Sequence, residues 1–313
     1  TGSRQRSVRG WGVRRSSLLA VLIAAVAVIA FTACSSTPSP RRSSTGAPAV
    51  SSTASPAPTS ASSASSSADR AATPSTTSPR PAAPTPSAPV PPAASGPLVV
   101  LNPGHNGQDA SHPEIINRLV PYNFHGGLKP CETTGTETNG GYPEHAFNFD
   151  DALRVRANMQ EHGVREALTR PTDDGVGPCV DERARIGNQP GSVAVVSIHA
   201  DGAPSGDHGF HVCYASDPPA GATVDAASRR LSTLIHDSLA SDSGLVPASY
   251  IGDGHGYFPR SDLGGLELAT VPATFLEVGN MRNAGDAALQ TSPAGRQRIA
   301  AAIATGILAF VGR

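Results

Sequence analysis

The sequence has few aromatic residues and a single lysine. Aromatic side chains make up 4% of its 313 residues, and Lys129 is the only lysine, so arginine carries nearly all of the positive charge. The formal net charge at pH 7 is −1. This balance gives no reason to expect a nucleic-acid partner, because nucleic-acid binding calls for a basic patch or stripe.

Two signatures of common hydrolases and metal modules are also missing. The sequence has no G-x-S-x-G motif, so nothing supports a nucleophilic serine hydrolase of the α/β type. It has no C-x-x-C pair either, so a structural zinc ribbon is not expected.

Residues 1–34 have the three parts of an export signal. An uncharged apolar stretch of sixteen residues, 18–33, is shorter than the roughly 20 residues that span a bilayer. It follows a positive segment that contains Arg4, Arg6, Arg9, Arg14 and Arg15.

The end of this segment, residues 31–34, reads Phe-Thr-Ala-Cys and resembles a bacterial lipoprotein box, although Phe31 stands where an aliphatic residue is usual. Lipidation of Cys34 with a membrane tether, cleavage near Ala33, and an uncleaved membrane anchor all stay open. Each of them places the mature protein outside the cytoplasmic membrane, in the periplasmic or cell-wall space.

Residues 35–96 consist mostly of serine, threonine, proline and alanine. Such a segment has too few large apolar residues to offset the entropy of ordering, so we expect a disordered, semi-extended linker. The remainder, 97–313, is long enough for one well-buried domain. We expect this domain to be a monomer.

Apolar runs and helical periodicity alternate within 97–313. Strands are predicted at 98–101, 164–168, 193–198, 209–214 and 273–277, and helices at 144–161, 181–188, 223–240 and 294–311. Strands that alternate with helices predict a single three-layer α/β/α domain with a mostly parallel central sheet.

Three side chains that could bind a metal or transfer a proton each follow a short apolar run: His105, His199 and Glu277. Parallel sheets place ligand sites just beyond the carboxyl ends of their strands, so these residues are expected to share one site. Each also has a plainer interpretation: a loop histidine, a hydrogen-bonded core histidine, and a carboxylate paired with Arg260 or Arg282. Two strand-end histidines together favour a shared cation, because neutral imidazole is the commonest metal ligand.

A carboxylate in the first turn of a helix is the third candidate ligand. Glu144 follows Pro143, which suits a helix start, and a His/Glu/His set with one open position is typical of catalytic zinc sites. The same stretch offers His145, Glu137 and Glu132 as rival ligands.

Taken together, these residues resemble the zinc-dependent N-acetylmuramoyl-L-alanine amidases of the type 3 family, in particular their secreted actinobacterial form. The resemblance covers essentially all of 97–313 in five blocks that fall in the family's order. These blocks are residues 101–105, the helix of Glu144, residues 168–170 with Arg183 and Asn188, residues 197–201, and residues 272–280.

The resemblance implies that His105, Glu144 and His199 bind one zinc ion and that Glu277 is the catalytic glutamate. It implies cleavage of the amide between the lactyl group of N-acetylmuramic acid and L-alanine, in peptidoglycan or in muramoyl-peptide fragments. The family usually has asparagine where this chain has Asp201, a position that is not a ligand. A wall-binding module without activity and a zinc peptidase that cuts within the stem peptide are the alternatives.

Three cysteines remain once Cys34 is set aside, so one pair and one free thiol are expected. Cys213 lies in a predicted strand, where a buried free thiol is ordinary. Cys131 and Cys179 lie in loops rich in proline and glycine, and the resemblance also implies that these two form a disulfide.

Overall fold

The computed structural model describes residues 95–217 and 219–313. The predicted export signal (1–34), the predicted lipidation site Cys34 and nearly all of the predicted linker (35–96) lie outside these residues. Within the described residues, no helix combines the length and the apolar character needed to cross a membrane.

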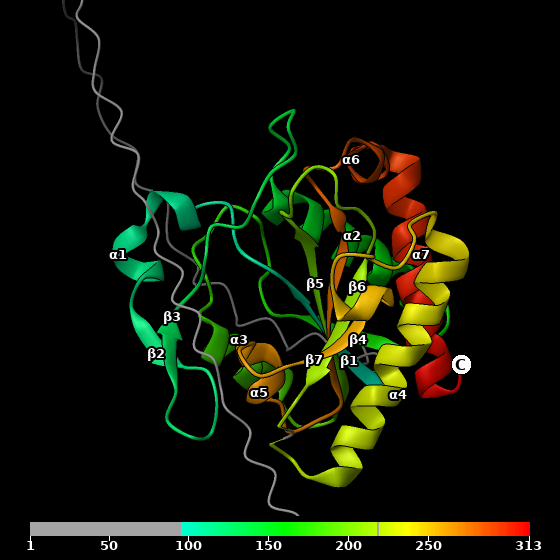
Figure 1. The fold of residues 1–313 in the computed structure, drawn as a ribbon. Coiled ribbons are helices and arrows are strands. Elements are labelled where there is room, and N and C mark those ends of the chain that lie inside the picture. Colours follow the sequence, from blue (N-terminus) through cyan, green and yellow to red (C-terminus); the bar gives the residue numbers. More distant parts are fainter. Residues whose placement is uncertain (1–94, 218) are drawn as a thin grey trace, which may run out of the picture. The chain divides into compact units, whose positions relative to one another are not determined.

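One mixed sheet forms the centre of the domain (Figure 1). Its strand order is β4-β1-β5-β8-β6-β7, and neighbouring strands are parallel except for β6 and β8. The mostly parallel sheet is thus confirmed. The strands are β1 (Leu98–Pro103), β4 (Arg165–Leu168), β5 (Ser192–Asp201), β6 (His211–Ala215), β7 (Tyr257–Arg260) and β8 (Ala273–Asn280).

Helices cover both faces of the sheet, which gives the predicted three layers (Figure 1). The first face packs against α2 (Glu144–Gln160), α4 (Ala222–Ser238) and α7 (Pro293–Val311), and the second against α3 (Val180–Gly187) and α5 (Gly264–Glu267). The smaller elements are η1 (Asp109–Ser111), α1 (Pro113–Ile116), the hairpin β2 (Leu119–Pro121) and β3 (Leu128–Pro130), η2 (Leu239–Ser243), η3 (Gly252–Gly254) and α6 (Ala284–Thr291).

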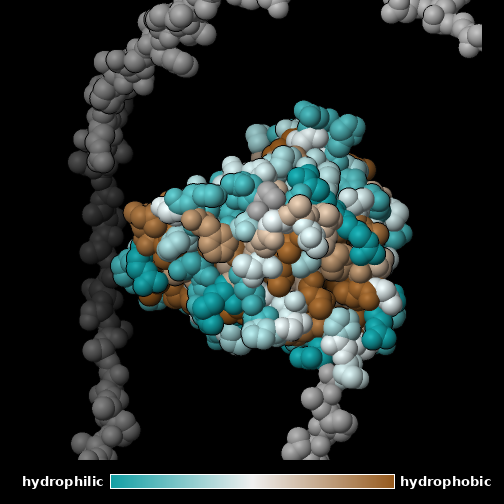
Figure 2. All heavy atoms as spheres, turned by 90° about the horizontal axis from the view of Figure 1, so that it is seen from below, coloured by the Kyte–Doolittle hydropathy of each residue, from teal (hydrophilic) through white to brown (hydrophobic). Residues whose placement is uncertain are grey.

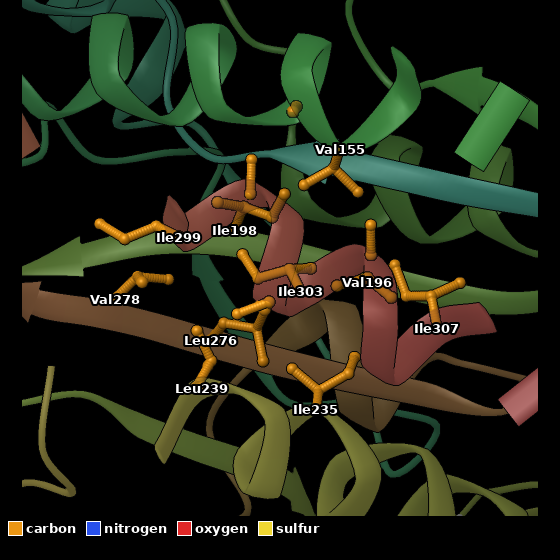
Figure 3. Packing of buried hydrophobic residues seen from close by; sticks show 14 of the residues in the cluster. Val155, Val196, Ile198, Ile235, Leu239, Leu276, Val278, Ile299, Ile303 and Ile307 are labelled. Carbon is orange, nitrogen blue, oxygen red and sulfur yellow. The ribbon is translucent and has the colours of Figure 1, made fainter. Parts of the chain in front are cut away.

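The main core lies between the sheet and the first helical layer (Figure 3). Ile299, Ile303 and Ile307 repeat at helical spacing on α7 and are fully buried. They pack with Val196 and Leu276, which point from β5 and β8 toward the same layer. Burial of such side chains stabilises a fold by about 1.5–3 kcal/mol each, which fixes α7 across the sheet.

Several elements differ from the sequence prediction. β5 continues to Asp201 and β8 to Asn280, so His199 and Glu277 lie two and three residues before their strand ends rather than at them. The edge strand β7 was not predicted because its sequence, Tyr-Phe-Pro-Arg, contains a proline, which demotes an interior-strand assignment. The short helix α6 and the hairpin of β2 and β3 were also not predicted.

The hairpin of β2 and β3 carries the three most exposed large apolar side chains of the described residues. Leu119, Phe124 and Leu128 are 58–60% exposed. In Figure 2 one group of brown residues lies at the left side of the domain, the side on which Figure 1 places this hairpin, and another lies toward the right.

Gly306 permits a close crossing of α7 and α4. A Cβ atom at this position would lie 2.5 Å from the Cα atom of Ile235. Gly306→Ala gains helix propensity, worth roughly 0.5–1 kcal/mol. The backbone clash should cost more, so we expect a net loss of about 1–2 kcal/mol in the free energy of unfolding, measured by urea denaturation.

The matched control is Gly206→Ala, because a Cβ atom at Gly206 meets nothing within 4 Å. This change should leave stability nearly unchanged or raise it slightly through the unfolded state. Equal effects of the two substitutions would contradict the close helix crossing.

The structure joins Cys131 to Cys179, the predicted pair, and leaves Cys213 buried and free. The bridge closes a segment with a sequence separation of 48. By the chain-entropy model, replacing both bridged cysteines with serine should lower the free energy of unfolding by about 4 kcal/mol. Non-reducing peptide mapping checks the pairing, and a bridge from either residue to Cys213 would refute it.

Candidate metal centre

His105 occupies a tight turn directly after β1, with a positive φ of 55°. Its neighbour must be glycine, since a Cβ atom at Gly104 would lie 2.0 Å from the His199 ring. The Nδ1 atom of His105 lies 2.8 Å from the carbonyl oxygen of Thr133. Because a carbonyl only accepts hydrogen bonds, this contact places the proton on Nδ1 and leaves the Nε2 lone pair for another partner.

His199 reaches the same point from β5. Its Nδ1 atom lies 3.0 Å from Oε1 of Glu144, and its ring stacks on Phe275 at a centroid distance of 4.4 Å. Burial lowers the pKa of His199, against the opposing effect of the hydrogen bond that His199 donates to Glu144. The ring is therefore held in its neutral form, which is the form that binds metals.

Glu144 begins α2 and joins the two histidines. Its Oε1 atom lies 3.1 Å from Nε2 of His105 and 3.0 Å from Nδ1 of His199. Its Oε2 atom accepts a hydrogen bond from the backbone N–H of Thr136 at 2.9 Å, and Asn148 donates to Oε1 at 3.2 Å. Burial opposes ionisation of this carboxyl, but the facing imidazoles hold its pKa well below the usual range.

The ligand atoms of His105, Glu144 and His199 all lie within 4.8 Å of one another. Two imidazole nitrogens and one carboxylate oxygen match the donor set of a three-ligand zinc site, so these residues fit the metal. The rival ligands are elsewhere: His145 pairs with Asp173 at 2.8 Å, and Glu137 is exposed.

Glu132, the third rival, faces the far side of the His105 ring. Its Oε1 atom lies 3.4 Å from Nδ1, the ring nitrogen opposite the one that faces Glu144. It is therefore a neighbour of a candidate ligand and not a member of the cluster.

Glu277 lies beside His199, because β5 and β8 pair these two residues in register. Its Oε2 atom is buried and has no hydrogen-bond partner within the described part of the chain. Burial, and then the carboxylates of Glu144 and Asp201, raise the pKa of Glu277 well above its usual value.

The expected arginine partners of Glu277 are engaged elsewhere. Arg260 pairs with Asp262 at 2.7 Å, and Arg282 contacts the side chain of Asn139 at 3.5 Å. A structural ion pair therefore does not account for the position of Glu277.

A pocket of about 360 Å³ opens over these residues. Its lining includes the three candidate ligands, Glu277, Phe275 and Lys129. It continues along the sheet face toward Val180 of α3 and Gly264 of α5. The site thus combines a metal-ligand cluster, an unpaired carboxylate and room for a substrate.

Two further features of this site were not predicted from the sequence. His211 lies next to Glu277 on the antiparallel strand β6, and burial lowers its pKa to about 4. Tyr250 donates a hydrogen bond to Asp201 at 2.7 Å from a loop 49 residues further along the chain. The position of His211 depends on the antiparallel direction of β6, and that of Tyr250 depends on a long loop. The sequence carried no signal for either feature.

Comparison with known proteins identifies relatives over the described domain. The family profile described as N-acetylmuramoyl-L-alanine amidase (Amidase_3) matches residues 99–309. The N-acetylmuramoyl-L-alanine amidase Rv3717 of Mycobacterium tuberculosis is 46% identical over 218 residues, which are 69% of this chain and 87% of that protein.

Solved structures of amidases match the same domain. The amidase Ami1 of Mycobacterium smegmatis is 47% identical, with a TM-score of 0.65 over 70% of this chain and 98% of its own. The apo form of Ami1 from Mycobacterium abscessus is 49% identical, with a TM-score of 0.64 over 69% and 99%. The chain therefore belongs to the Amidase_3 family of N-acetylmuramoyl-L-alanine amidases, hydrolases of an amide bond in peptidoglycan.

Proposed function

We propose that the amidase activity of this chain depends on one zinc ion held by His105, Glu144 and His199, with Glu277 as the general base. The observation that carries the proposal is the convergence of three ligand atoms within 4.8 Å beside a carboxylate that has no partner for Oε2. A buried carboxylate without a partner is costly, which favours a functional role for it.

Zinc in such a site supplies Lewis acidity toward the attacking water and the scissile carbonyl. The residues of the chain supply orientation and proton transfer. Glu144 and the two imidazoles would supply three protein ligands, the number typical of catalytic rather than structural zinc sites.

Glu277 accepts a proton from the attacking water as its oxygen bonds to the amide carbon. The same carboxyl group then gives this proton to the nitrogen of the departing L-alanine, so that the C–N bond breaks and a neutral amine leaves. The Oε2 atom of Glu277 has no partner among the described residues, so it is free to take up and return this proton.

The proposed substrate is the amide between the lactyl group of N-acetylmuramic acid and the L-alanine of the stem peptide, in the wall polymer or in fragments. A wall location agrees with the predicted export signal and linker, which remain proposals. Mass spectrometry of digested fragments tests the bond: release of an intact peptide supports an amidase, and cuts within the peptide would indicate a peptidase.

His199→Ala should remove most of the bound zinc, since it deletes one of three ligands. Elemental analysis of the purified protein measures the zinc content directly. His145→Ala is the matched control, because this half-buried histidine pairs with Asp173 and lies outside the cluster. Full zinc occupancy in the His199 variant would refute the ligand set.

Glu277→Gln should keep zinc and fold while it loses turnover by a factor on the order of 10²–10⁴, the usual contribution of general acid–base catalysis. A residue that only stabilised the fold would instead lower the melting temperature and leave turnover intact. Cleavage of a muramoyl peptide, zinc content and melting temperature are measured on one preparation. Near-normal turnover of the zinc-loaded variant would rule out the general-base role.

A further inference from the structure

Glu132 is a buried carboxylate behind the candidate metal centre. Its side chain is 7% exposed, and its Oε1 atom lies 3.4 Å from Nδ1 of His105. The carbonyl oxygen of Thr133 lies 2.8 Å from the same nitrogen. The imidazole N–H therefore donates to the Thr133 carbonyl oxygen, and the Glu132 carboxylate lies beside this bond at 3.4 Å, as does the Thr133 hydroxyl.

A buried guanidinium keeps Glu132 in place. Nε of Arg183 lies 3.0 Å from Oε2 of Glu132. The guanidinium carries a permanent positive charge, so this contact joins Glu132 to a fixed counter-charge.

The same arginine holds the turn that carries His105. Its Nη1 atom donates to the carbonyl oxygen of Pro103 at 2.7 Å, and its Nη2 atom donates to the carbonyl oxygen of His105 at 3.0 Å. Arg183 thus fixes the distance between the His105 turn and Glu132 from one rigid, planar group.

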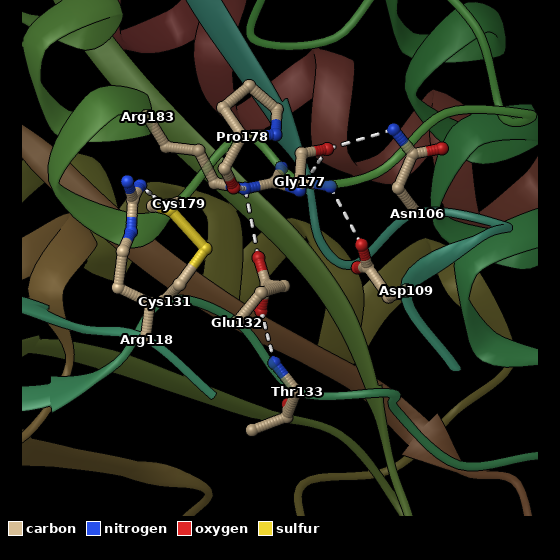
Figure 4. The surroundings of a disulfide bond; sticks show 10 residues. All are labelled: Asn106, Asp109, Arg118, Cys131, Glu132, Thr133, Gly177, Pro178, Cys179 and Arg183. Atoms are coloured by element: carbon tan, nitrogen blue, oxygen red, sulfur yellow. Dashed lines mark hydrogen bonds and ion pairs between the residues drawn. A yellow bond between two sulfur atoms is a disulfide. The ribbon is translucent and has the colours of Figure 1, made fainter. Parts of the chain in front are cut away.

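The disulfide anchors both sides of this arrangement (Figure 4). Cys131 directly precedes Glu132, and Cys179 lies at the start of α3, which carries Arg183. The backbone N–H of Val180 also donates to the carbonyl oxygen of Cys131 at 2.9 Å. The segment of Glu132 and the helix of Arg183 are therefore joined covalently and by hydrogen bonds.

We propose that Glu132 is a positioning residue of the metal centre: it orients His105 through Nδ1 and strengthens the binding of zinc at Nε2. The inference rests on the proposed ligand role of His105. Carboxylates that accept the free N–H of a ligating histidine fix its tautomer and raise its basicity, and their loss typically weakens metal affinity by 10–100-fold. A purely structural role, in which Glu132 only neutralises Arg183, is the alternative.

The test compares Glu132→Gln with Glu137→Gln, an exposed glutamate five residues along the same loop. Zinc dissociation constants are measured by competition with a chromophoric chelator, and cobalt-loaded protein provides a visible absorption spectrum. We expect Glu132→Gln to bind zinc about 10–100-fold more weakly and to shift the cobalt spectrum. Glu137→Gln should match the unaltered protein in both measurements.

Melting temperatures of the zinc-free proteins separate the two roles. A lower melting temperature with an unchanged dissociation constant would overturn the inference and favour the structural role. If Glu132→Gln does not fold, Glu132→Asp replaces it, because aspartate keeps the charge near Arg183 but is one methylene shorter. Weaker zinc binding by that folded variant supports the inference, and unchanged binding overturns it.

The outcome for the unaltered protein distinguishes this inference from the proposed function. Failure of the unaltered protein to bind one zinc per chain would refute the ligand assignment itself. Stoichiometric binding by the unaltered protein, with equal affinity in Glu132→Gln, would refute only the role of Glu132.

Discussion

The register between β5 and β8 is the constraint on which the rest of the site depends. It sets His199 opposite Glu277, and the antiparallel pairing of β6 sets His211 opposite Glu277 on the other side. Directly opposed residues point to the same face of a sheet, so three ionisable side chains form a row. If one of these strands slipped by one residue relative to its neighbour, its ionisable side chain would point into the apolar core.

The surroundings shift the pKa values of two glutamates in the same pocket in opposite directions. Glu144 faces two imidazoles, which lower its pKa, whereas burial and nearby carboxylates raise the pKa of Glu277. Two carboxyl groups with opposed environments can take different roles, one as a permanent anion and one as a proton carrier. The fold achieves this separation by placing one at a helix start and the other within a strand.

The sequence predicted the elements whose signal is local. Apolar runs located β1, β5 and β8, and the isoleucine stripe located α7. The site followed from the same runs, because His105, His199 and Glu277 each come after one. The contacts of Glu132 and Arg183 could not be predicted in the same way. Glu132 was one of several carboxylates near Glu144, and only the three-dimensional contacts distinguish a neighbour of His105 from a ligand. The antiparallel direction of β6 has no local sequence signal at all.

The buried thiol of Cys213 has a consequence for oxidative folding. Burial and the nearby Glu277 carboxylate raise its pKa far above the usual range, and thiolates are the species that exchange with disulfides. Once β6 has paired with β8, Cys213 is chemically silent, and Cys131 and Cys179 have no competitor among the described residues. Before that pairing, the thiol of Cys213 is accessible and can form a disulfide with either of the other two. Oxidation before the sheet forms therefore allows bridges to Cys213, whereas the burial of Cys213 in the finished sheet protects it from them.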